Sequence, residues 1–501
     1  MLAVVASSFA QDTRQVAEPK IPPSCKVLHA ELTAIDNKLA EEEESKSDTE
    51  RLQSALNDCK PGMAVELRPA TERFTFLARI TRKPVVERNA FLTAPIKLRE
   101  GVTLLIDKGV TLYGSRNPKD YETTPGLCGI ITDEAGGGCR PLISVENAKN
   151  AAIMGDGIID GRGDAELFGY DYSWWRMARA ATLGNRHYNS TRLIVANHAD
   201  GFILYRITLH NAPNYHVGVV NTNGFTAWDV HIQTPTVIGT DARNTDGIDP
   251  GSSTNITIAH SWIDNGDDNI AIKTGVTHMS VLDNHFYNGH GMSIGSDTYS
   301  GDSNLLVDGL TLDHTTSGIR IKSNNSRGGI VKDLLYRNIC MRNVQVPISI
   351  SPFYDNKTID AFVDPNIQGD RIPTYKRITL RNITALTPGD VLIAGKDAAH
   401  LTAVTLDNVN ILGIKPEQVH AQFANITMGP HGANFTPTGN GVTVTAAAVV
   451  VAGAKPAAGT ANPKPASGAA AGTANTKPAR AASSAAPAAP YGCDGKFLTM
   501  Q

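Results

Sequence analysis

The segments DGID (246–249), DNIA (268–271), HGMS (290–293) and SGIR (317–320) begin 22, 22 and 27 residues apart, within the stretch from Asn244 to Lys322. Two of them continue into IAIK (270–273) and IRIK (319–322), which alternate apolar with polar or small residues. This alternation is typical of a strand with one buried face. Recurrence at such a period predicts a coiled array of short strands. If the strands stack in register, Asp246, Asp268 and His290 lie above one another, about 4.8 Å per rung.

A second set of segments repeats with a similar spacing. NITI (255–258), HMSV (278–281), NLLV (304–307) and GIV (329–331) begin 23, 26 and 25 residues apart, and Asn, Asp and Gly recur between them at a similar phase. Together the two sets predict an all-β protein built as a parallel β-helix, with several short strands per coil and about ten coils. No helical period competes with this pattern after residue 62.

One helix is expected before the strands begin. Leu52, Ala55 and Leu56 follow a helical period, and Ser47 and Glu50 have the spacing of a capping box. The pattern ends near residues 59–62. A helix at this place would cover the open end of the strand array, whose edge would otherwise expose unpaired backbone groups.

The patterns divide the chain into four regions. Residues 1–10 are apolar and end in small residues, like a secretory signal; residues 11–46 form an irregular N-terminal extension; residues 47–443 form the β-helix domain; and residues 444–501 form an Ala- and Pro-rich low-complexity tail. We therefore expect a secreted protein. No apolar stretch is as long as a bilayer requires, so we expect no membrane span.

The segment from 164 to 191 is longer and less regular than its neighbours. We expect it to be a loop that crosses one face of the coil. It carries Trp174 and Trp175, for which packing against the coil is favoured over stacking on a sugar ring.

Charge and cysteine content narrow the possible functions. The chain has 501 residues and a formal net charge of −3, which gives no basic field for nucleic acid. Its six cysteines form no CxxC pair, which argues against a zinc site. An even number of cysteines suits an oxidising compartment. We predict three disulfides: Cys128–Cys139, which closes a small ring, Cys25–Cys59 and Cys340–Cys493.

Charged side chains concentrate at one phase of the coils. In GDDNIAIK (266–273) the isoleucines should point into the coil, which places Lys273 and Asn269 outside. Strict alternation would bury Asp268, and a buried carboxylate without a partner is costly. We therefore expect the chain to bend at Gly266 or Asp268, so that Asp267 and Asp268 both reach an outer groove.

Three carboxylates should meet in this groove. Asp246, Asp267 and Asp268 would repel one another, so at least one of them should have a raised pKa. A protonated carboxyl facing ionised ones is the acid–base arrangement of glycoside hydrolysis. Arg320 and Lys322 share a strand face nearby. If they only neutralise the carboxylates, the cluster is structural; if they face an open groove, they would bind an anionic substrate.

Four motifs in this stretch resemble the signature motifs of the polygalacturonases, glycoside hydrolase family 28. They are NTDG (244–247), GDD (266–268), GHG (289–291) and RIK (320–322), and they follow the family's order at fitting spacings. The resemblance covers roughly residues 47–440, and up to Ser296 it is greatest to bacterial endo-polygalacturonases. It implies a right-handed, single-stranded parallel β-helix with an open groove for a galacturonan chain.

The resemblance also implies roles for individual residues. Four are expected to be catalytic: Asp267 as the general acid, Asp246 and Asp268 activating the water, and His290 hydrogen-bonded beside the acid. Four are expected to bind substrate: Asn244, Arg320, Lys322 and, as the best match to a tyrosine that follows the basic motif, Tyr354, for which a packing role is the ordinary alternative. The implied mechanism is inverting, with acid and base about 6.5–9.5 Å apart.

The sequence leaves other interpretations open. An exo-acting enzyme or a rhamnogalacturonan hydrolase could use the same fold, although the intact NTD (244–246) counts against the second. A pectate lyase would be expected to use calcium and an arginine base. A non-catalytic adhesin or carbohydrate-binding protein would not require Asp267, Asp268 and His290 together. A calcium cluster is the structural alternative for the aspartates. For Asp249 and Asp297, roles in turns fit at least as well as roles in the site.

We expect a monomer that hydrolyses α-1,4 bonds in de-esterified polygalacturonate. No cofactor, metal, nucleic acid or membrane partner is expected.

Overall fold

The computed structural model describes residues 11–71, 87–134, 136–234, 242–356, 362–447 and 489–500. The signal-like segment 1–10 and residues 448–488 of the predicted tail lie outside the described residues. None of the helices in the described part of the chain has the length and apolar character needed to cross a bilayer.

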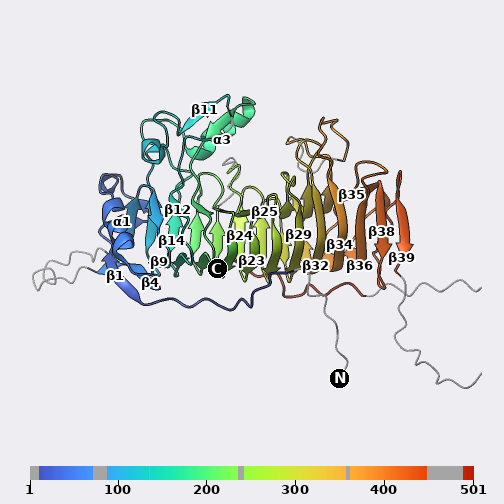
Figure 1. The fold of residues 1–501 in the computed structure, drawn as a ribbon, viewed down its shortest axis with the longest axis horizontal. Helices are drawn as coiled ribbons and strands as arrows, with labels where there is room; N and C mark the ends of the chain where they lie inside the picture. The colour runs from blue at the N-terminus through green and yellow to red at the C-terminus, as the bar shows by residue number, and fades with distance from the viewer. Residues whose placement is uncertain are drawn as a thin grey trace, which may run out of the picture.

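The chain coils into a parallel β-helix in which most coils contribute three strands, whereas the coils near the C-terminus contribute two, one of them long (Figure 1). One strand of each coil belongs to an 11-stranded sheet that we call the groove sheet. The prediction of an all-β parallel β-helix of about ten coils is confirmed. The groove sheet contains β8 (Ile96–Leu98), β12 (Ile143–Glu146), β16 (Ile194–Asn197), β19 (Val217–Val220), β22 (Ile248–Gly251), β25 (Ile270–Ile272), β28 (Met292–Ile294), β31 (Ser317–Lys322), β33 (Val346–Ser351), β35 (Val391–Ala394) and β37 (Val419–Gln422).

The remaining strands of the coils join in a 22-stranded sheet that wraps the other sides. Its members are β1 (Ser24–His29), β4 (Met63–Arg68), β7 (Ala90–Thr93), β9 (Val102–Ile106), β10 (Thr111–Gly114), β13 (Ala152–Met154), β14 (Ile158–Asp160), β17 (Ile203–Tyr205), β18 (Thr208–His210), β20 (Asn223–Trp228), β21 (His231–Gln233), β23 (Thr254–Ala259), β24 (Trp262–Asn265), β26 (Thr277–Leu282), β27 (His285–Asn288), β29 (Asp302–Asp308), β30 (Thr311–Asp313), β32 (Ile330–Arg342), β34 (Thr374–Ala385), β36 (Thr402–Ile411), β38 (Ala424–Met428) and β39 (Thr443–Ala446). The predicted domain boundary at residue 443 falls inside β39.

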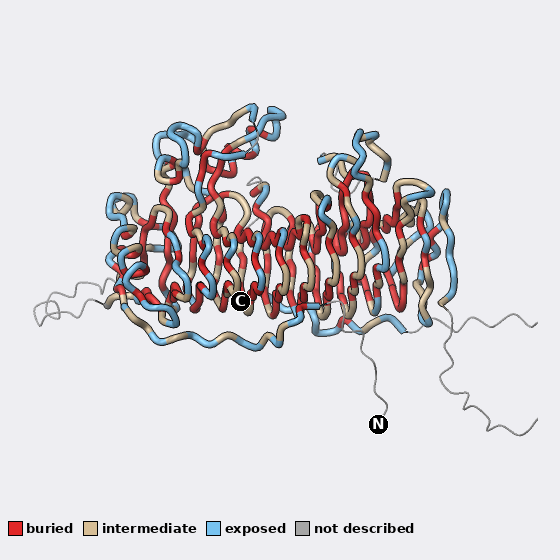
Figure 2. The backbone as a smooth tube through the Cα atoms, viewed as in Figure 1, coloured by how far each residue is buried: buried red, intermediate tan, exposed pale blue. Residues whose placement is uncertain are grey.

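Apolar side chains fill the inside of the coil along its whole length. In Figure 2 the buried residues form continuous tracks along the strands, whereas exposed residues gather in the loops above and below. The inward isoleucines of neighbouring rungs, Ile248 and Ile270, are in register and fully buried. This aliphatic stack holds the strands in one register, because a slip by one residue would turn every inward side chain outward.

The stacked column predicted from the first set of segments is confirmed. Ile248 pairs with Ile270, which pairs with Met292, which in turn pairs with Ile319. The positions two residues earlier therefore share one phase. They are Asp246, Asp268, His290 and Ser317, which we call the catalytic column.

The predicted alignment of the second set of segments is right for its first three members and wrong for the fourth. The registers of β23, β26 and β29 align Asn255, His278 and Asn304. The next rung, however, aligns Asn304 with Asp333 rather than with Gly329. These residues all have left-handed backbone, with φ of 57°, 55°, 60° and 62° along the column. Asn and Asp tolerate this conformation, so the column is a left-handed bend repeated in each coil, and a glycine is not needed there.

A helix covers the N-terminal end of the coil, as predicted. This helix, α1 (Thr49–Asp58), buries Leu52, Ala55 and Leu56. The predicted capping box is wrong, because the N-cap is Asp48 and no side chain caps the helix. The Asp48 carboxylate instead accepts a hydrogen bond from Leu92 N at 2.8 Å, which fastens the helix to β7.

The N-terminal extension is less irregular than expected. It contains β1, which pairs in parallel with β4 as the outermost rung. Before β1, the chain runs along one side of the coil (Figure 1). Ser280 Oγ accepts a hydrogen bond from Asp12 N, and Glu18 accepts one from the Tyr205 hydroxyl. The extension is therefore a strap that crosses several coils.

All three predicted disulfides are present: Cys25–Cys59, Cys128–Cys139 and Cys340–Cys493. The third joins β32 to the C-terminal segment, whose Leu498 carbonyl accepts a hydrogen bond from Tyr287. The N-terminal strap and the described C-terminal segment are thus both fastened to the outside of the coil.

The loop from 164 to 191 contains a helix that the sequence pattern did not predict. The helix α3 (Trp174–Leu183) is capped by Ser173, whose hydroxyl accepts from Arg176 N at 3.2 Å. Trp174 and Trp175 are buried, and Trp175 Nε1 donates to the Ala212 carbonyl at 2.9 Å. The packing role favoured for both tryptophans is confirmed. The helix has only ten residues, so its helical periodicity extends over too short a stretch to be recognised within the strand pattern.

Candidate active site

The structure gathers the predicted catalytic residues along the edge of the groove sheet. Asp246 precedes β22, Asp267 and Asp268 lie between β24 and β25, and His290 precedes β28. Arg320 and Lys322 lie on β31, one rung further along. In Figure 1, the loops containing β11 (Ile130–Thr132) and α3 rise beside this part of the coil, before β25, and a second group of loops rises after it, beside β35.

Two close approaches of the backbone shape the turn that carries Asp267 and Asp268. A Cβ on Gly266 would lie 2.3 Å from the Ala242 carbonyl oxygen, and a Cβ on Gly289 would lie 2.5 Å from the Asp267 carbonyl oxygen. Only glycine fits at both positions. The rungs on either side therefore pack directly against the backbone of the turn.

The expected bend exists, but at another place. Asn269, predicted to lie outside, is fully buried and donates to Asn265 Oδ1 at 2.7 Å and to the Ile263 carbonyl at 3.1 Å. Ile270 is also fully buried. The alternation therefore breaks between Asn269 and Ile270, rather than at Gly266 or Asp268. Oxygen atoms inside the coil accept the hydrogen bonds of the Asn269 side-chain amide. The pattern of apolar residues in the sequence could not reveal these partners.

Asp268 lies in a buried cluster of charges. Its Oδ1 accepts from Ser293 Oγ at 2.7 Å and from Arg320 at 3.0 Å, and its Oδ2 accepts from Lys322 Nζ at 2.7 Å. Burial opposes ionisation, but the charges of Lys322 and Arg320 outweigh it and lower the pKa of Asp268. Asp268 is therefore held as a carboxylate in a fixed orientation.

Asp267 is paired with the histidine of the next rung. His290 Nδ1 lies 3.2 Å from Asp267 Oδ1, and Asn244 N donates to Oδ2 at 3.2 Å. Burial opposes ionisation of Asp267, but the charge and hydrogen bond of His290 outweigh it and lower its pKa. Burial also lowers the pKa of His290, but Asp267 outweighs this effect and raises it. The pair therefore holds one proton, on the histidine side.

Asp246 is the carboxyl that holds its proton most firmly among the three. Burial and the nearby charge of Asp267 raise its pKa to about 6, although Lys273 Nζ lies only 3.3 Å from its Oδ2. The expectation that at least one carboxyl has a raised pKa is confirmed, and it concerns Asp246 rather than Asp267. Asp249 lies deeper, 3.6 Å from the same ammonium, and burial raises its pKa well above the usual value.

The remaining predicted residues border the cluster. The Tyr354 ring lies 5.1 Å from Lys322 Nζ and 5.8 Å from the Arg320 guanidinium, and burial raises its pKa to about 12. Asn244 lies beside Asp267 and has left-handed backbone, with φ of 56°. Asp297, in contrast, pairs with Arg327 at 3.6 Å and is half exposed.

Three residues of the site were missed as functional candidates. Lys273 and Ser293 both stand in the repeated segments, and the register places Ser293 next to Arg320 on the groove sheet. The period therefore contained a signal for both. Tyr188 lies on β15 (His187–Asn189), in the insertion, and has no such signal.

Tyr188 orients the side chain of Asn244. Its hydroxyl accepts from Asn214 Nδ2 at 3.0 Å and donates to Asn244 Oδ1 at 2.9 Å. With its oxygen occupied in this way, the Asn244 side chain offers its NH₂ group as a donor to the groove. Burial and the charge of Asp267 raise the pKa of Tyr188, which keeps the hydroxyl protonated.

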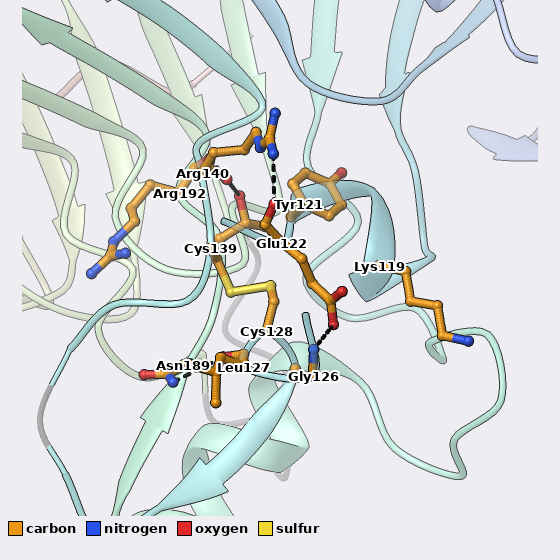
Figure 3. The surroundings of a disulfide bond; sticks show 12 residues. Lys119, Tyr121, Glu122, Gly126, Leu127, Cys128, Cys139, Arg140, Asn189 and Arg192 are labelled. Carbon is orange, nitrogen blue, oxygen red and sulfur yellow. Dashed lines mark hydrogen bonds between the residues drawn. A yellow bond between two sulfur atoms is a disulfide. The ribbon is translucent and has the colours of Figure 1, made fainter. Parts of the chain in front are cut away.

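The disulfide ring holds the strand that carries Tyr188. β15 pairs with β11, which lies inside the ring closed by Cys128 and Cys139. Figure 3 shows the disulfide beside Asn189, whose Nδ2 donates to the Leu127 carbonyl at 2.9 Å. A Cβ on Gly138 would lie 2.1 Å from the same carbonyl oxygen, so the ring packs tightly at this place.

One group in the described part of the chain offers ligand atoms close enough for a metal ion. The ligand atoms of Asp267, Asp268 and His290 lie within 4.8 Å of one another. However, Arg320 and Lys322 already neutralise Asp268, and a divalent cation there would face both of these charges. The group fits an acid–base cluster better than a metal site.

Comparison with known proteins gives one family and close relatives. Residues 84–431 match the family described as glycosyl hydrolases family 28. An endo-polygalacturonase of Pectobacterium carotovorum subsp. carotovorum is 41% identical over 411 residues, which cover 81% of this chain and 91% of that protein. A polygalacturonase of Ralstonia solanacearum is 34% identical, with 87% of each chain covered. The solved polygalacturonase of Erwinia carotovora ssp. carotovora is 38% identical, with a TM-score of 0.69, and the match covers 82% of this chain and 100% of that one.

Proposed function

Because the chain belongs to glycosyl hydrolase family 28, we propose that it is an endo-polygalacturonase, which hydrolyses internal α-1,4-galacturonosidic bonds in de-esterified pectin. The proposal rests above all on the charges around the catalytic column. Four cationic side chains, Lys273, His290, Arg320 and Lys322, outnumber the carboxylates that stay ionised at mildly acidic pH, because burial raises the pKa of Asp246 and of Asp249. A groove of this kind attracts a chain of uronate carboxylates.

We assign the general acid to Asp267, acting with His290. The imidazolium supplies the proton of the pair, and Asp267 presents it to the glycosidic oxygen as that oxygen gains negative charge. His290 Nδ1 lies 3.2 Å from Asp267, within reach for this transfer. The lowered pKa of Asp267 applies to the site without substrate. When substrate binds, the glycosidic oxygen becomes a further acceptor for the proton that Asp267 and His290 share.

We assign activation of the water to Asp246 and Asp268. Asp268 is fixed as a carboxylate by Arg320 and Lys322, and Asp246 becomes one as pH rises through about 6. Water attack from this side inverts the anomeric configuration. Arg320, Lys322 and Tyr354 then hold the galacturonate next to the scissile bond, and Asn244 donates to the sugar on the other side.

The requirement for free carboxylates sets the substrate range. Methyl esters remove the negative charge that Arg320 and Lys322 would bind, so we expect slow hydrolysis of highly esterified pectin. We further propose that the protein is secreted and acts as a monomer. All six of its cysteines lie in disulfides, which suits an oxidising compartment.

Product analysis tests the proposed function. Polygalacturonate is digested with a chelator present, and reducing ends and oligomer sizes are followed together. We expect a mixture of oligomers early in the reaction, with the newly formed reducing ends in the inverted configuration by NMR. Monomer or dimer from the start would indicate exo action, and products with a retained configuration would exclude the assigned mechanism.

The pH dependence tests the role of Asp246. Because Asp246 acts only when ionised and its pKa is raised to about 6, kcat/KM should rise with pH through about 6. Lys273→Met removes a charge that lowers this pKa, so the acid limb should move to higher pH. Lys376→Met, an exposed lysine on β34, is the matched control. An acid limb that stays in place in Lys273→Met would contradict the assignment.

The same ionisation has a cost in stability. The folded protein keeps the Asp246 proton to higher pH than the unfolded chain does, since its pKa is raised from 3.8 to about 6. The Asp246 contribution to the free energy of unfolding should therefore fall as pH rises across this window.

A further inference from the structure

The catalytic column continues for two rungs before Asp246. Ile194 pairs with Val217, which pairs with Ile248, so the positions two residues earlier are again in phase. Leu193 N donates to the Tyr215 carbonyl, and His216 N donates to the Asp246 carbonyl, which confirms this alignment. Arg192, Tyr215 and Asp246 therefore follow one another along the same edge of the groove sheet.

Arg192 presents its charge along this edge. Its guanidinium lies over the Tyr215 ring, 5.6 Å from the centroid, on the side of the next coil. In Figure 3 its side chain extends away from the disulfide. Arg192 is only partly buried, so a ligand can reach it.

The Nε of Arg192 is buried and has no hydrogen-bond partner among the described residues. None of the ion pairs within this part of the chain includes Arg192. Arg186, which lies in the preceding insertion, differs in this respect, because its Nε donates to Asp133 at 2.8 Å. A guanidinium stacked on a tyrosine and lacking a carboxylate is prepared to bind an external one.

The charges nearby point to the same ligand. Arg192 is close enough to Tyr188 and Tyr215 to act on both of their pKa values, and both tyrosines also feel the charge of Asp246. Arg192 therefore lies in the same groove as the catalytic column. Two rungs separate it from Asp246, roughly 10 Å along the axis.

We propose that Arg192 binds the carboxylate of a galacturonate unit about two sugars away from the scissile bond, on the side of Asp246. Arg320 and Lys322 bind at the opposite side, so the two basic sites grip the chain on both sides of the bond that is cleaved. The inference rests on the proposed function and adds a specificity residue to it. Arg192 acts on substrates long enough to reach it.

Chain-length dependence tests the proposal. Arg192→Gln and the matched control Arg186→Gln are compared with the wild type on oligogalacturonates of increasing length. We expect Arg192→Gln to lower kcat/KM by about tenfold on long substrates, the value of one charge-assisted hydrogen bond. Short oligomers that end before the Arg192 position should be cleaved at the wild-type rate, and Arg186→Gln should change neither.

Each outcome has a distinct meaning. An equal loss at every length, or no loss at any length, would overturn the role of Arg192. Arg192→Lys should retain part of the length dependence, because it keeps the charge but loses the forked geometry. If the wild type cleaves no oligogalacturonate at all, the proposed function fails, and this result is separate from any property of Arg192.

Discussion

Replacing Asp267 with asparagine is expected to lower kcat on polygalacturonate by about 10²–10⁴-fold, the contribution of a positioned general acid. Asparagine keeps the size of the side chain, and its single oxygen can still accept from the backbone nitrogen of Asp268, whereas its NH₂ group replaces the oxygen that accepts from Asn244 N. It cannot pass a proton from His290 to the glycosidic oxygen. KM should change much less than kcat, because the groups that bind the substrate carboxylates remain.

The matched control is Asp264→Asn, which alters a carboxylate three residues earlier in the same coil. Asp264 accepts from Asn288 at 2.8 Å, on a strand outside the groove sheet, and should be replaceable without loss of kcat. A substrate with a leaving group that needs no protonation should recover most of the rate of Asp267→Asn. If this substrate restores the rate of Asp246→Asn instead, Asp246 is the general acid, and the roles of Asp246 and Asp267 must be exchanged.

The backbone of the site could be predicted from sequence because strand geometry is strictly periodic. Intervals of 22, 22 and 27 residues place Asp246, Asp268, His290 and Ser317 in one phase whatever the loops between them do. The prediction failed where the spacing was misleading. Gly329 was placed in the second set of segments by its distance of 25 residues from Asn304, but the register selects Asp333, whose neighbours pair with β29.

The parts of the site that sequence did not reveal depend on contacts between distant segments. Tyr188 reaches Asn244 only because a disulfide ring and a short strand pair hold the insertion over the groove. Asn269 turns inward because amides of its own and the next coil satisfy it. The protonation of the acid pair likewise follows from the distance between Asp267 and His290, which spacing alone cannot give.

Replacing Lys322 with methionine is expected to destabilise the fold as well as impair binding. Lys322 Nζ donates to Asp268 Oδ2 at 2.7 Å, and both side chains are almost completely buried. Breaking a buried pair leaves an uncompensated charge, at a cost of about 3 kcal/mol here, the lower end of the usual range because Arg320 still neutralises Oδ1. Urea unfolding at neutral pH would measure this loss against Lys376→Met, which should change the free energy of unfolding by less than about 0.5 kcal/mol.

The pH dependence of this loss identifies its cause. In the wild type the pKa of Asp268 is lowered, so its ion pairs add stability above the unfolded pKa of 3.8, and this stability is lost only as pH falls through the lower, folded value. In Lys322→Met the carboxyl should take up a proton at higher pH, which removes the unpaired charge. The difference between wild type and variant should therefore narrow as pH falls from 7 towards about 4. A difference that stays constant over this range would mean that lost packing of the lysine chain, rather than the buried charge of Asp268, destabilises the variant.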